Sequence, residues 1–250
     1  MLNTNLLIIN GVMLMYEELH KIIAESNNIV FFGGAGVSTE SGIPDFRSVD
    51  GLYNQKYKYP PEVILSHTFF MRNTKDFFEF YREKMIFEHA KPNKAHLALA
   101  KLEQAGKLKA VVTQNIDGLH QMAGSKNVLE LHGSIHRNYC TKCGKSYELE
   151  YIKSTNDVPM CICGGIVKPD VVLYEEPLDS TILEKSVQYI SQADVLIVGG
   201  TSLNVYPAAG LIDYYRGNKL ILINKSSTPA DARANLVIHE PIGEVLGSVV

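Results

Sequence analysis

The four cysteines of this chain stand in two close pairs. Cys140 and Cys143 enclose two residues, and after a gap of seventeen residues Cys161 and Cys163 enclose one. Two pairs at this separation are typical of a zinc ribbon, in which four thiolates complete a tetrahedron around the metal. The second pair is one residue tighter than the commoner spacing, which still permits chelation. We therefore predict one structural Zn²⁺, with a redox dithiol or unligated cysteines as the alternatives. A catalytic zinc is not expected, because no position is left for water.

A glycine-rich segment follows the first apolar run of the chain. The backbone amides of Gly34, Ala35 and Gly36 are placed as in turns that bring a helix N-terminus to a pyrophosphate. The segment departs from the dehydrogenase fingerprint at Thr39, and no acidic residue lies around 55–60 to bind a ribose. Hydride transfer is therefore not expected, and a plain tight turn is the alternative to a nucleotide site.

Two opposite charges and an aromatic ring come directly after this segment, as Asp45, Phe46 and Arg47. An arginine beside a phosphate site can bind it in a bidentate manner, and an aromatic ring can shield a reactive sugar from water. The alternative is a packed loop in which Arg47 pairs with Asp45.

Residues suited to ligand binding also follow three further apolar runs. They are Gln114, Asn115, Ile116 and Asp117 after 110–113, then Gly200, Thr201 and Ser202 after 194–198, and Asn224 after 220–223. Open α/β sheets bind ligands at the carboxyl ends of their strands. Amide, carboxylate and hydroxyl groups suit a carboxamide and ribose hydroxyls, although an Asx turn or a helix cap explains any one of them. Four such strand ends together favour a nucleotide site.

His132 is the candidate general base among the eight histidines. It follows the apolar segment 128–131 and precedes Gly133, which places it at a strand end beside the segment that begins at Gln114. An imidazole changes its charge near neutral pH and is therefore suited to activating an alcohol. We expect most of the other histidines to have no part in the chemistry.

A parallel sheet is the scaffold that these residues need. The short apolar runs 29–32, 110–113, 194–198, 220–223 and 236–238 have the continuous character of strands buried on both faces, and helical spacing separates them over 16–26, 94–105 and 178–192. The predicted fold class is α/β, a Rossmann-like doubly wound parallel sheet. The aromatic-rich stretch 50–90 and the cysteine-bearing stretch 138–167 interrupt the alternation and predict a smaller lobe.

Composition describes a globular protein with a sizeable core. The 250 residues are 46% hydrophobic and 20% charged, and the net charge of −3 gives no sign of the basic face of a nucleic-acid-binding protein. No apolar run approaches the roughly 20 residues of a membrane span. Without export or membrane signals, a cytoplasmic location is expected. Residues 1–15 are interpreted as an N-terminal extension, because translation could begin at Met13 or Met15.

These motifs resemble those of the sirtuins, the family of NAD-dependent protein lysine deacylases, over nearly all of residues 16–250. The matching motifs stand in the family's order: Gly34-Ala-Gly-Val-Ser-Thr-Glu-Ser-Gly-Ile-Pro-Asp-Phe-Arg47, Thr113-Gln-Asn-Ile-Asp117, Leu131-His-Gly133, the four cysteines, Gly200-Thr-Ser-Leu203, Val205-Tyr-Pro-Ala208 and Asn224. The resemblance implies an NAD-binding domain with a small lobe. Their expected extents are 16–49, 91–137 and 168–250 for the domain, 50–90 for a helical module and 138–167 for a zinc-binding module.

The resemblance also implies roles for single residues. Catalysis would depend on His132, Asn115 and Asp117. The residues that would hold NAD are Gly34, Ala35, Gly36, Thr39, Asp45, Phe46, Arg47, Gln114, Asn115, Ile116, Asp117, His132, Gly200, Thr201, Ser202, Asn224 and Ile242. The acyl-lysine would lie along Val172, Leu173, Tyr174, Glu175 and Glu176.

The reaction that the resemblance implies consumes NAD. The acyl oxygen of the substrate lysine attacks C1′ of the nicotinamide ribose and nicotinamide leaves. His132 then acts as general base on the ribose hydroxyls, and the products are nicotinamide, O-acetyl-ADP-ribose and free lysine. The zinc would hold the small lobe in place.

The chain departs from the family pattern in its substrate segment. Tyr174, Glu175 and Glu176 stand where the family usually has Phe-Gly-Glu. Tyr81 and Lys84 resemble a Tyr and Arg pair of sirtuins that prefer succinyl or malonyl groups, yet acetyl-lysine is the expected substrate. ADP-ribosyl transfer and an NAD-sensing module are the alternative functions. We expect a monomer whose partners are acylated lysines of proteins, not nucleic acids or membranes.

Overall fold

The computed structural model describes residues 2–48 and 51–250. Six parallel strands form the main sheet in the order β3-β2-β1-β7-β8-β9. Their bounds are β1 (Ile29–Gly33), β2 (Leu108–Thr113), β3 (Val128–Glu130), β7 (Val195–Gly199), β8 (Leu220–Ile223) and β9 (Leu236–Ile238). The chain starts in the middle of the sheet and winds outward to both sides, which is the order of a Rossmann-like doubly wound fold. The predicted fold class is thereby confirmed.

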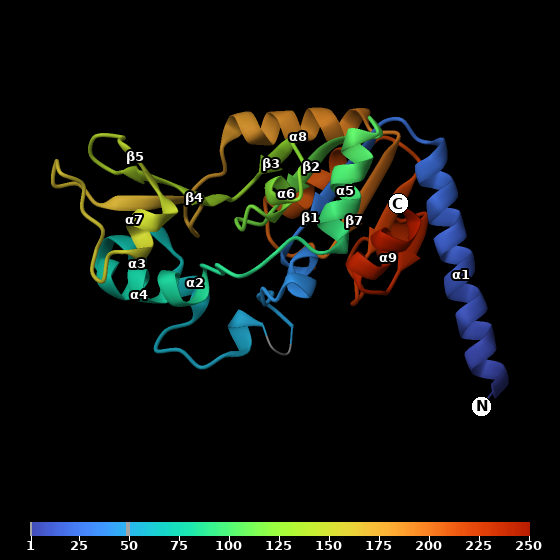
Figure 1. The fold of residues 1–250 in the computed structure, drawn as a ribbon, viewed down its shortest axis with the longest axis horizontal. Helices are drawn as coiled ribbons and strands as arrows, with labels where there is room; N and C mark the ends of the chain where they lie inside the picture. The colour runs from blue at the N-terminus through green and yellow to red at the C-terminus, as the bar shows by residue number, and fades with distance from the viewer. Residues whose placement is uncertain (1, 49–50) are drawn as a thin grey trace.

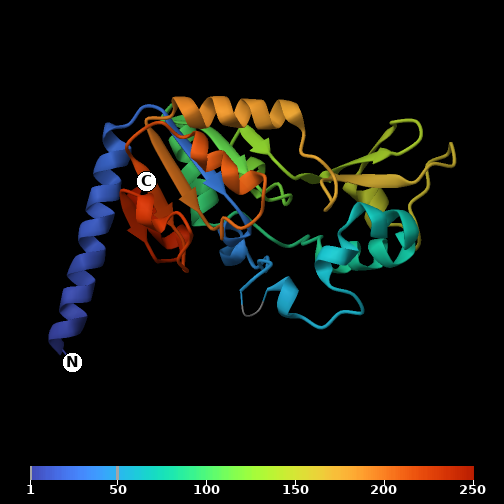
Figure 2. The ribbon, with the colours of Figure 1, turned by 180° about the vertical axis from the view of Figure 1, so that it is seen from behind.

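Helices cover both faces of this sheet (Figures 1 and 2). One face packs against α1 (Leu2–Glu25), α5 (Lys94–Gln104) and α9 (Ile242–Val249). The other packs against α8 (Ser180–Gln192) and the 3-10 helix η4 (Ala208–Tyr214). Every residue of β1, β7 and β8 is buried as a result, which explains why these strands consist of uninterrupted apolar residues.

Side chains at the helix ends explain where two of these helices start. The Asn93 side chain accepts a hydrogen bond from the amide of Ala95 and, with His96, forms a capping box before α5. The Asp179 carboxylate accepts from the amide of Ile182 at 2.9 Å at the start of α8. These elements begin and end within about two residues of the predicted ones.

Helix α1 is much longer than the helix predicted from residue 16. It begins at Leu2 and continues because residues 2–15 contain no proline to interrupt it. Its second half packs onto the sheet layer through Leu19 and Ile23, whereas its first half projects away from the body (Figure 1). The assignment of residues 1–15 to an extension stays a prediction, and Met1 lies outside the described residues.

The smaller lobe combines an antiparallel sheet with short helices. The sheet has the order β5-β4-β6, with β4 (Gly133–Cys140), β5 (Ser146–Glu148) and β6 (Val167–Val171). The helices are α2 (Pro61–Ile64), α3 (His67–Arg72), α4 (Thr74–Lys84) and α7 (Leu149–Lys153). The aromatic side chains of α3 and α4 pack with apolar side chains of the sheet and of α7 in one hydrophobic core. The helical stretch and the cysteine-bearing stretch therefore pack as one lobe.

Short helical segments connect these parts. They are η1 (Ala35–Val37), η2 (Thr39–Ser41), η3 (Leu52–Asn54), α6 (Leu119–Met122) and η5 (Asp231–Arg233).

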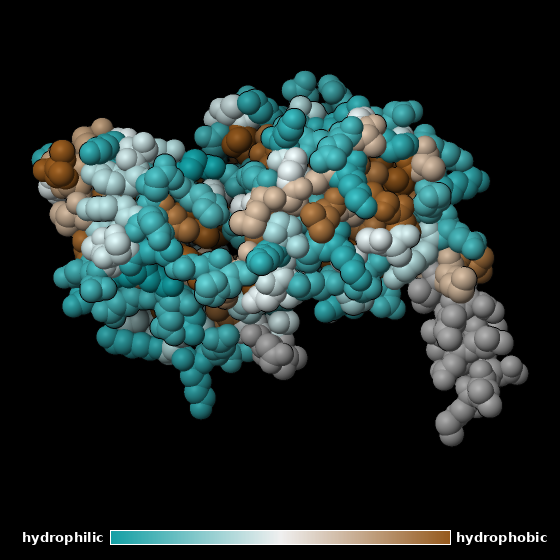
Figure 3. Space-filling view, viewed as in Figure 1, coloured by the Kyte–Doolittle hydropathy of each residue, from teal (hydrophilic) through white to brown (hydrophobic). Residues whose placement is uncertain are grey.

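Hydrophilic residues cover most of the face seen in Figure 3, with a hydrophobic group over the region of α5 and the C-terminus. Among the described residues, no helix is both long enough and apolar enough to cross a membrane.

Candidate active site

The glycine-rich turn after β1 packs directly against the end of β7. A Cβ atom on Gly36 would lie 2.8 Å from Cα of Gly200, and one on Gly34 would lie 2.9 Å from Cβ of Thr201. The amide of Gly36 donates to the carbonyl of Gly200 at 2.8 Å. Only residues without a side chain permit this approach. The turn therefore keeps its backbone close to the sheet edge, an arrangement that fits the phosphates of a dinucleotide.

Replacing Gly200 by alanine is expected to disrupt this packing. Its φ of +58° disfavours a side chain, and a Cβ atom would lie 2.3 Å from the amide nitrogen of Val37. Gly106 is the matched control, because its φ is +72° while nothing lies within 4 Å of its Cβ position. We expect Gly200→Ala to lower the melting temperature by about 10 °C and Gly106→Ala by about 3 °C, measured by calorimetry. Equal shifts would contradict the packing account.

Ser38 joins two segments that are distant in the sequence. Its hydroxyl donates to the Asp117 carboxylate at 2.6 Å and accepts from the Asn115 side-chain amide at 3.0 Å. Ser38 and Asn115 are buried, with 1% and 9% of their surface exposed. The second oxygen of Asp117 accepts from the amide of Leu119 at 2.9 Å, so the Asx turn considered from the sequence is also present. Ser38 thus fixes the amide and the carboxylate predicted to hold a carboxamide.

His132 lies beside the same segment, as its position after β3 predicts. Its Nδ1 is 2.9 Å from the carbonyl oxygen of Gln114, and the Gln114 side chain donates to the Thr201 hydroxyl at 3.0 Å. A carbonyl only accepts, so Nδ1 carries the proton and Nε2 holds the lone pair. Burial lowers the pKa of His132, and the hydrogen bond to Gln114 opposes this effect. The imidazole is therefore neutral near pH 7 and suited to accept a proton.

His96 and His120 form a buried pair in the core. Their ring centroids are 4.7 Å apart, and both side chains are almost fully enclosed. Burial lowers the pKa of His96 to about 4 and that of His120 to about 3. Both are therefore neutral core residues at ordinary pH.

The segment that carries Phe46 and Arg47 is a tightly closed loop. Asp45 accepts hydrogen bonds from the backbone amides of Arg47 and Ser48 at 3.0 and 2.7 Å, so it holds the loop through the backbone. The rings of Phe46 and Tyr53 contact each other edge to face, with centroids 5.5 Å apart. The Arg47 guanidinium lies 5.3 Å from the centre of the Tyr53 ring. Asp45 therefore bonds to the backbone amide of Arg47, and no ion pair joins the two side chains among the described residues; the guanidinium is exposed.

Of three further predicted residues, two follow strands of the main sheet and the third, Ile242, begins α9. Ser202 and Asn224 are half-buried after β7 and β8, and the Asn224 side chain donates to the carbonyl of Ser226 at 2.6 Å. Ile242 is buried in the core, where a Cβ atom on Gly199 would meet its Cδ1 at 2.3 Å. Its side chain therefore packs beneath this sheet edge.

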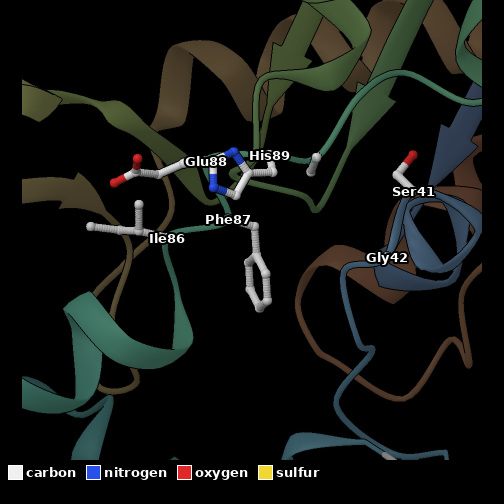
Figure 4. Close-up of a pocket in the computed structure, with 7 residues that line it drawn as sticks. Ser41, Gly42, Ile86, Phe87, Glu88 and His89 are labelled. Atoms are coloured by element: carbon white, nitrogen blue, oxygen red, sulfur yellow. The ribbon is translucent and has the colours of Figure 1, made fainter.

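A cavity of about 520 Å³ lies between η2 and the segment that leads into α5. Ser41 and Gly42 line one side, and residues 86–90 line the other (Figure 4). Figure 4 shows the ring of Phe87 and the imidazole of His89 on the side opposite Ser41. No motif in the sequence indicates this wall, which is the short segment between α4 and α5.

The predicted acyl-lysine segment, 172–176, continues from β6. The Val172 amide donates to the carbonyl of His132 at 3.0 Å, so this segment begins beside the candidate base. Leu173 is buried in the core of the small lobe and Tyr174 is exposed. The Tyr174 backbone is hydrogen-bonded to the chain around the start of α3: its amide donates to the Leu65 carbonyl at 2.9 Å, and its carbonyl accepts from the His67 amide at 3.0 Å.

The two glutamates of this segment hold its end in place. Glu175 has a φ of +74° and occupies the position where the family pattern has glycine. Its carboxylate accepts from the amide of Thr68 at 2.8 Å. The Glu176 carboxylate contacts Lys168 at 3.1 Å and His67 at 2.9 Å. The missing glycine is thus replaced by a residue whose carboxylate anchors the turn to α3.

The four cysteines converge at one end of the small lobe. Their sulfur atoms all lie within 4.8 Å of one another, with Cys140 to Cys163 at 3.4 Å and Cys143 to Cys161 at 3.6 Å. Four thiols from two turns at these distances fit a tetrahedral metal site in which every ligand is sulfur. The four side chains whose spacing predicts a metal site therefore lie together in the structure.

Known proteins resemble this chain over nearly its whole length. A protein of Clostridium acetobutylicum named NAD-dependent protein deacetylase is 71% identical over 238 residues, which cover 94% of this chain and 97% of that protein. A protein of the same name from Cutibacterium acnes is 53% identical over 93% of this chain and 96% of its own length.

Solved structures of Sir2 proteins also match the fold of this chain. A Sir2 protein bound to an acetylated peptide superposes with a TM-score of 0.83 at 39% identity, covering 93% of this chain and 96% of that one. A complex of a Sir2 protein with a p53 peptide and NAD⁺ gives a TM-score of 0.82 at 40% identity, with 93% and 95% coverage. The family model of the Sir2 family matches residues 34–207, which contain the glycine-rich turn, His132 and all four cysteines. The chain therefore belongs to the Sir2 family, the sirtuins.

Proposed function

We propose that the protein is an NAD-dependent protein lysine deacetylase that releases nicotinamide, O-acetyl-ADP-ribose and free lysine. One observation carries the proposal: a neutral, half-buried His132 is held by the carbonyl of Gln114, next to the cluster of Ser38, Asn115 and Asp117. Relatives of the same family carry the name NAD-dependent protein deacetylase, and a solved member was seen with an acetylated peptide. The supporting chemistry is that of a base beside a nucleotide-binding sheet edge.

Each part of the site has a role in this proposal. The turn at Gly34 and Gly36 approaches the phosphates of NAD through its backbone, and Arg47 supplies positive charge beside them. NAD itself supplies the electrophilic sugar carbon and the nicotinamide leaving group. Asn115 and Asp117 bind the carboxamide, with Ser38 fixing their geometry. His132 then removes a proton from a ribose hydroxyl through Nε2, so that this oxygen bonds to the acetyl carbon, and one water is consumed as free lysine leaves.

The four thiolates are proposed to bind one structural Zn²⁺ that supports the small lobe. Cys140 ends β4 and Cys143 follows it, while Cys161 and Cys163 precede β6, so the metal would hold the end of β4 to the chain that enters β6. Because β6 leads into the acyl-lysine segment, the metal would also stabilise the position of that segment. It would take no part in the chemistry.

The structure favours an acetyl group over a succinyl group. The hydroxyl of Tyr81 is enclosed within the aromatic core of the small lobe, and its ring stacks on Phe77 at 5.7 Å. Lys84 pairs with Glu83 at 2.9 Å and lies over the ring of Tyr57. Neither side chain is disposed to receive an acyl carboxylate. We expect acetyl-lysine peptides to be turned over faster than succinyl-lysine peptides of the same sequence.

A peptide assay tests the proposed function and its rival at once. The protein is incubated with NAD and an acetyl-lysine peptide, and the masses of peptide and protein are followed. Loss of the acetyl mass only when NAD is present supports deacetylation. An ADP-ribose mass added to protein, with the acetyl group retained, would identify an ADP-ribosyltransferase instead. Binding of NAD with neither change would leave an NAD-binding module.

The pH dependence of the reaction follows from the state of His132. Only the neutral imidazole accepts a proton, so kcat/KM falls as pH drops through its pKa. Burial lowers that pKa from its ordinary value of about 6.5, so activity should persist below that pH. We expect the acid limb of the kcat/KM profile to have its midpoint below about pH 6.5. A midpoint at or above that value would show that burial does not control the base.

A further inference from the structure

Two tyrosines link the loop of Phe46 and Arg47 to the acyl-lysine segment. The hydroxyl groups of Tyr53 and Tyr174 are hydrogen-bonded to each other, although 121 residues separate them in the sequence. Tyr53 belongs to η3 in the first loop and Tyr174 to the segment that follows β6. The contact is a direct connection between side chains of the two loops that the proposed function assigns to NAD and to the substrate.

Tyr53 is tied closely to the cofactor side of this connection. Its amide donates to the carbonyl of Phe46 at 2.9 Å, and its ring contacts both the Phe46 ring and the Arg47 guanidinium. Gly51 lets the chain close on itself here, since a Cβ atom at that position would lie 2.7 Å from the carbonyl carbon of Phe46. A displacement of the Tyr53 hydroxyl therefore also displaces the loop that carries Phe46 and Arg47.

Tyr174 is equally well fixed on the substrate side. Its backbone forms two hydrogen bonds to the chain around the start of α3, so the ring is attached to an anchored point. Burial raises the pKa of Tyr53, and its hydrogen bond with Tyr174 acts in the same direction. The Tyr53 phenol is therefore neutral at ordinary pH, and in this pair one hydroxyl donates while the other accepts.

We propose that the Tyr53–Tyr174 hydrogen bond couples the two ligand sites, so that binding of NAD and binding of the acyl-lysine peptide each promote the other. The proposal rests on the proposed function, which places NAD and peptide at these loops. Tyr174 is in this sense a positioning residue, because it acts on the cofactor loop through Tyr53. A ligand that orders either loop also holds the hydrogen bond and so orders the other loop.

The expected size of the coupling is that of one neutral hydrogen bond on a partly exposed surface. Such a bond changes an equilibrium constant on the order of fivefold. By linkage, the peptide should tighten binding of the nucleotide by the same factor as the nucleotide tightens binding of the peptide. The effect should be lost when either hydroxyl is removed.

The test measures binding of ADP-ribose by calorimetry, with and without a saturating acetyl-lysine peptide. ADP-ribose lacks nicotinamide, so no turnover occurs. In the wild-type protein the peptide should lower the Kd of ADP-ribose by about fivefold. In Tyr174→Phe and in Tyr53→Phe this factor should fall to about one, and the double variant should behave like each single variant. Tyr214→Phe is the matched control, because that tyrosine is 47% exposed and Tyr174 is 40% exposed.

The possible results separate this proposal from the proposed function. Wild-type coupling retained in Tyr174→Phe and Tyr53→Phe, with both ligands still bound, would overturn the coupling proposal alone. A loss of coupling in the Tyr214→Phe control would also overturn it, because the effect would not depend on this hydrogen bond. Failure of the wild-type protein to bind ADP-ribose and the peptide would overturn the proposed function, and the coupling with it.

Discussion

Replacing His132 by alanine should lower the rate of deacetylation by about 10²- to 10⁴-fold, the range for loss of a positioned general base. The base acts on the ribose hydroxyls after nicotinamide has left. Exchange of labelled nicotinamide into NAD, in the presence of the acetyl peptide, should therefore persist in His132→Ala. Mass spectrometry of the peptide and counting of the label measure the two steps separately.

The control for this variant is His20→Ala, because His20 is exposed on α1 and lies outside the site. That variant should keep full activity. His132→Ala should also keep the wild-type melting temperature within a few degrees, which excludes a general loss of structure. Deacetylation by His132→Ala within tenfold of the wild-type rate would contradict the role of His132 as the base.

Replacing Cys161 by serine should remove the metal and unfold the small lobe. Sites of four thiolates bind Zn²⁺ with apparent free energies on the order of 10 kcal/mol, and that energy is available to the folded state. Even a third of it, about 3 kcal/mol, lowers the melting temperature of a chain this long by about 10 °C. Elemental analysis of the purified protein should find one zinc per wild-type chain and none in the variant.

Thr141→Ala is the matched control, since Thr141 lies in the same cysteine-bearing turn, is exposed and makes no side-chain hydrogen bond among those of the described residues. It should keep its zinc and its stability. A strong chelator should reproduce the effect of Cys161→Ser on the wild-type protein. A variant that melts at the wild-type temperature without zinc would show that the metal does not hold the lobe together.

The parts of the fold that could be predicted have a local signal. Strands such as β1 and β8 are buried on both faces and therefore consist of uninterrupted apolar residues. The spacing of the cysteines indicates their site, because a chelating turn needs its two ligands only a few residues apart. His132 was found because it follows an apolar run and precedes a glycine.

Other features depend on contacts between distant segments and have no such signal. Ser38 is a small polar residue within a glycine-rich motif, and its partners Asn115 and Asp117 are 77 and 79 residues away. Strand β6 alternates buried and half-buried residues, but the proline at its centre argues against a strand, because proline has no amide hydrogen to donate to a neighbouring strand. The link between Tyr53 and Tyr174 exists only because the small lobe places the two loops side by side.

The most direct test of the account is the stoichiometry of the reaction. The purified protein is supplied with NAD and an acetyl-lysine peptide, and nicotinamide, free-lysine peptide and O-acetyl-ADP-ribose are quantified by mass spectrometry over one time course. The account predicts that the three products form in equal amounts and that none forms without NAD. Release of free acetate while NAD remains intact, or cleavage of NAD while the peptide keeps its acetyl group, would contradict it.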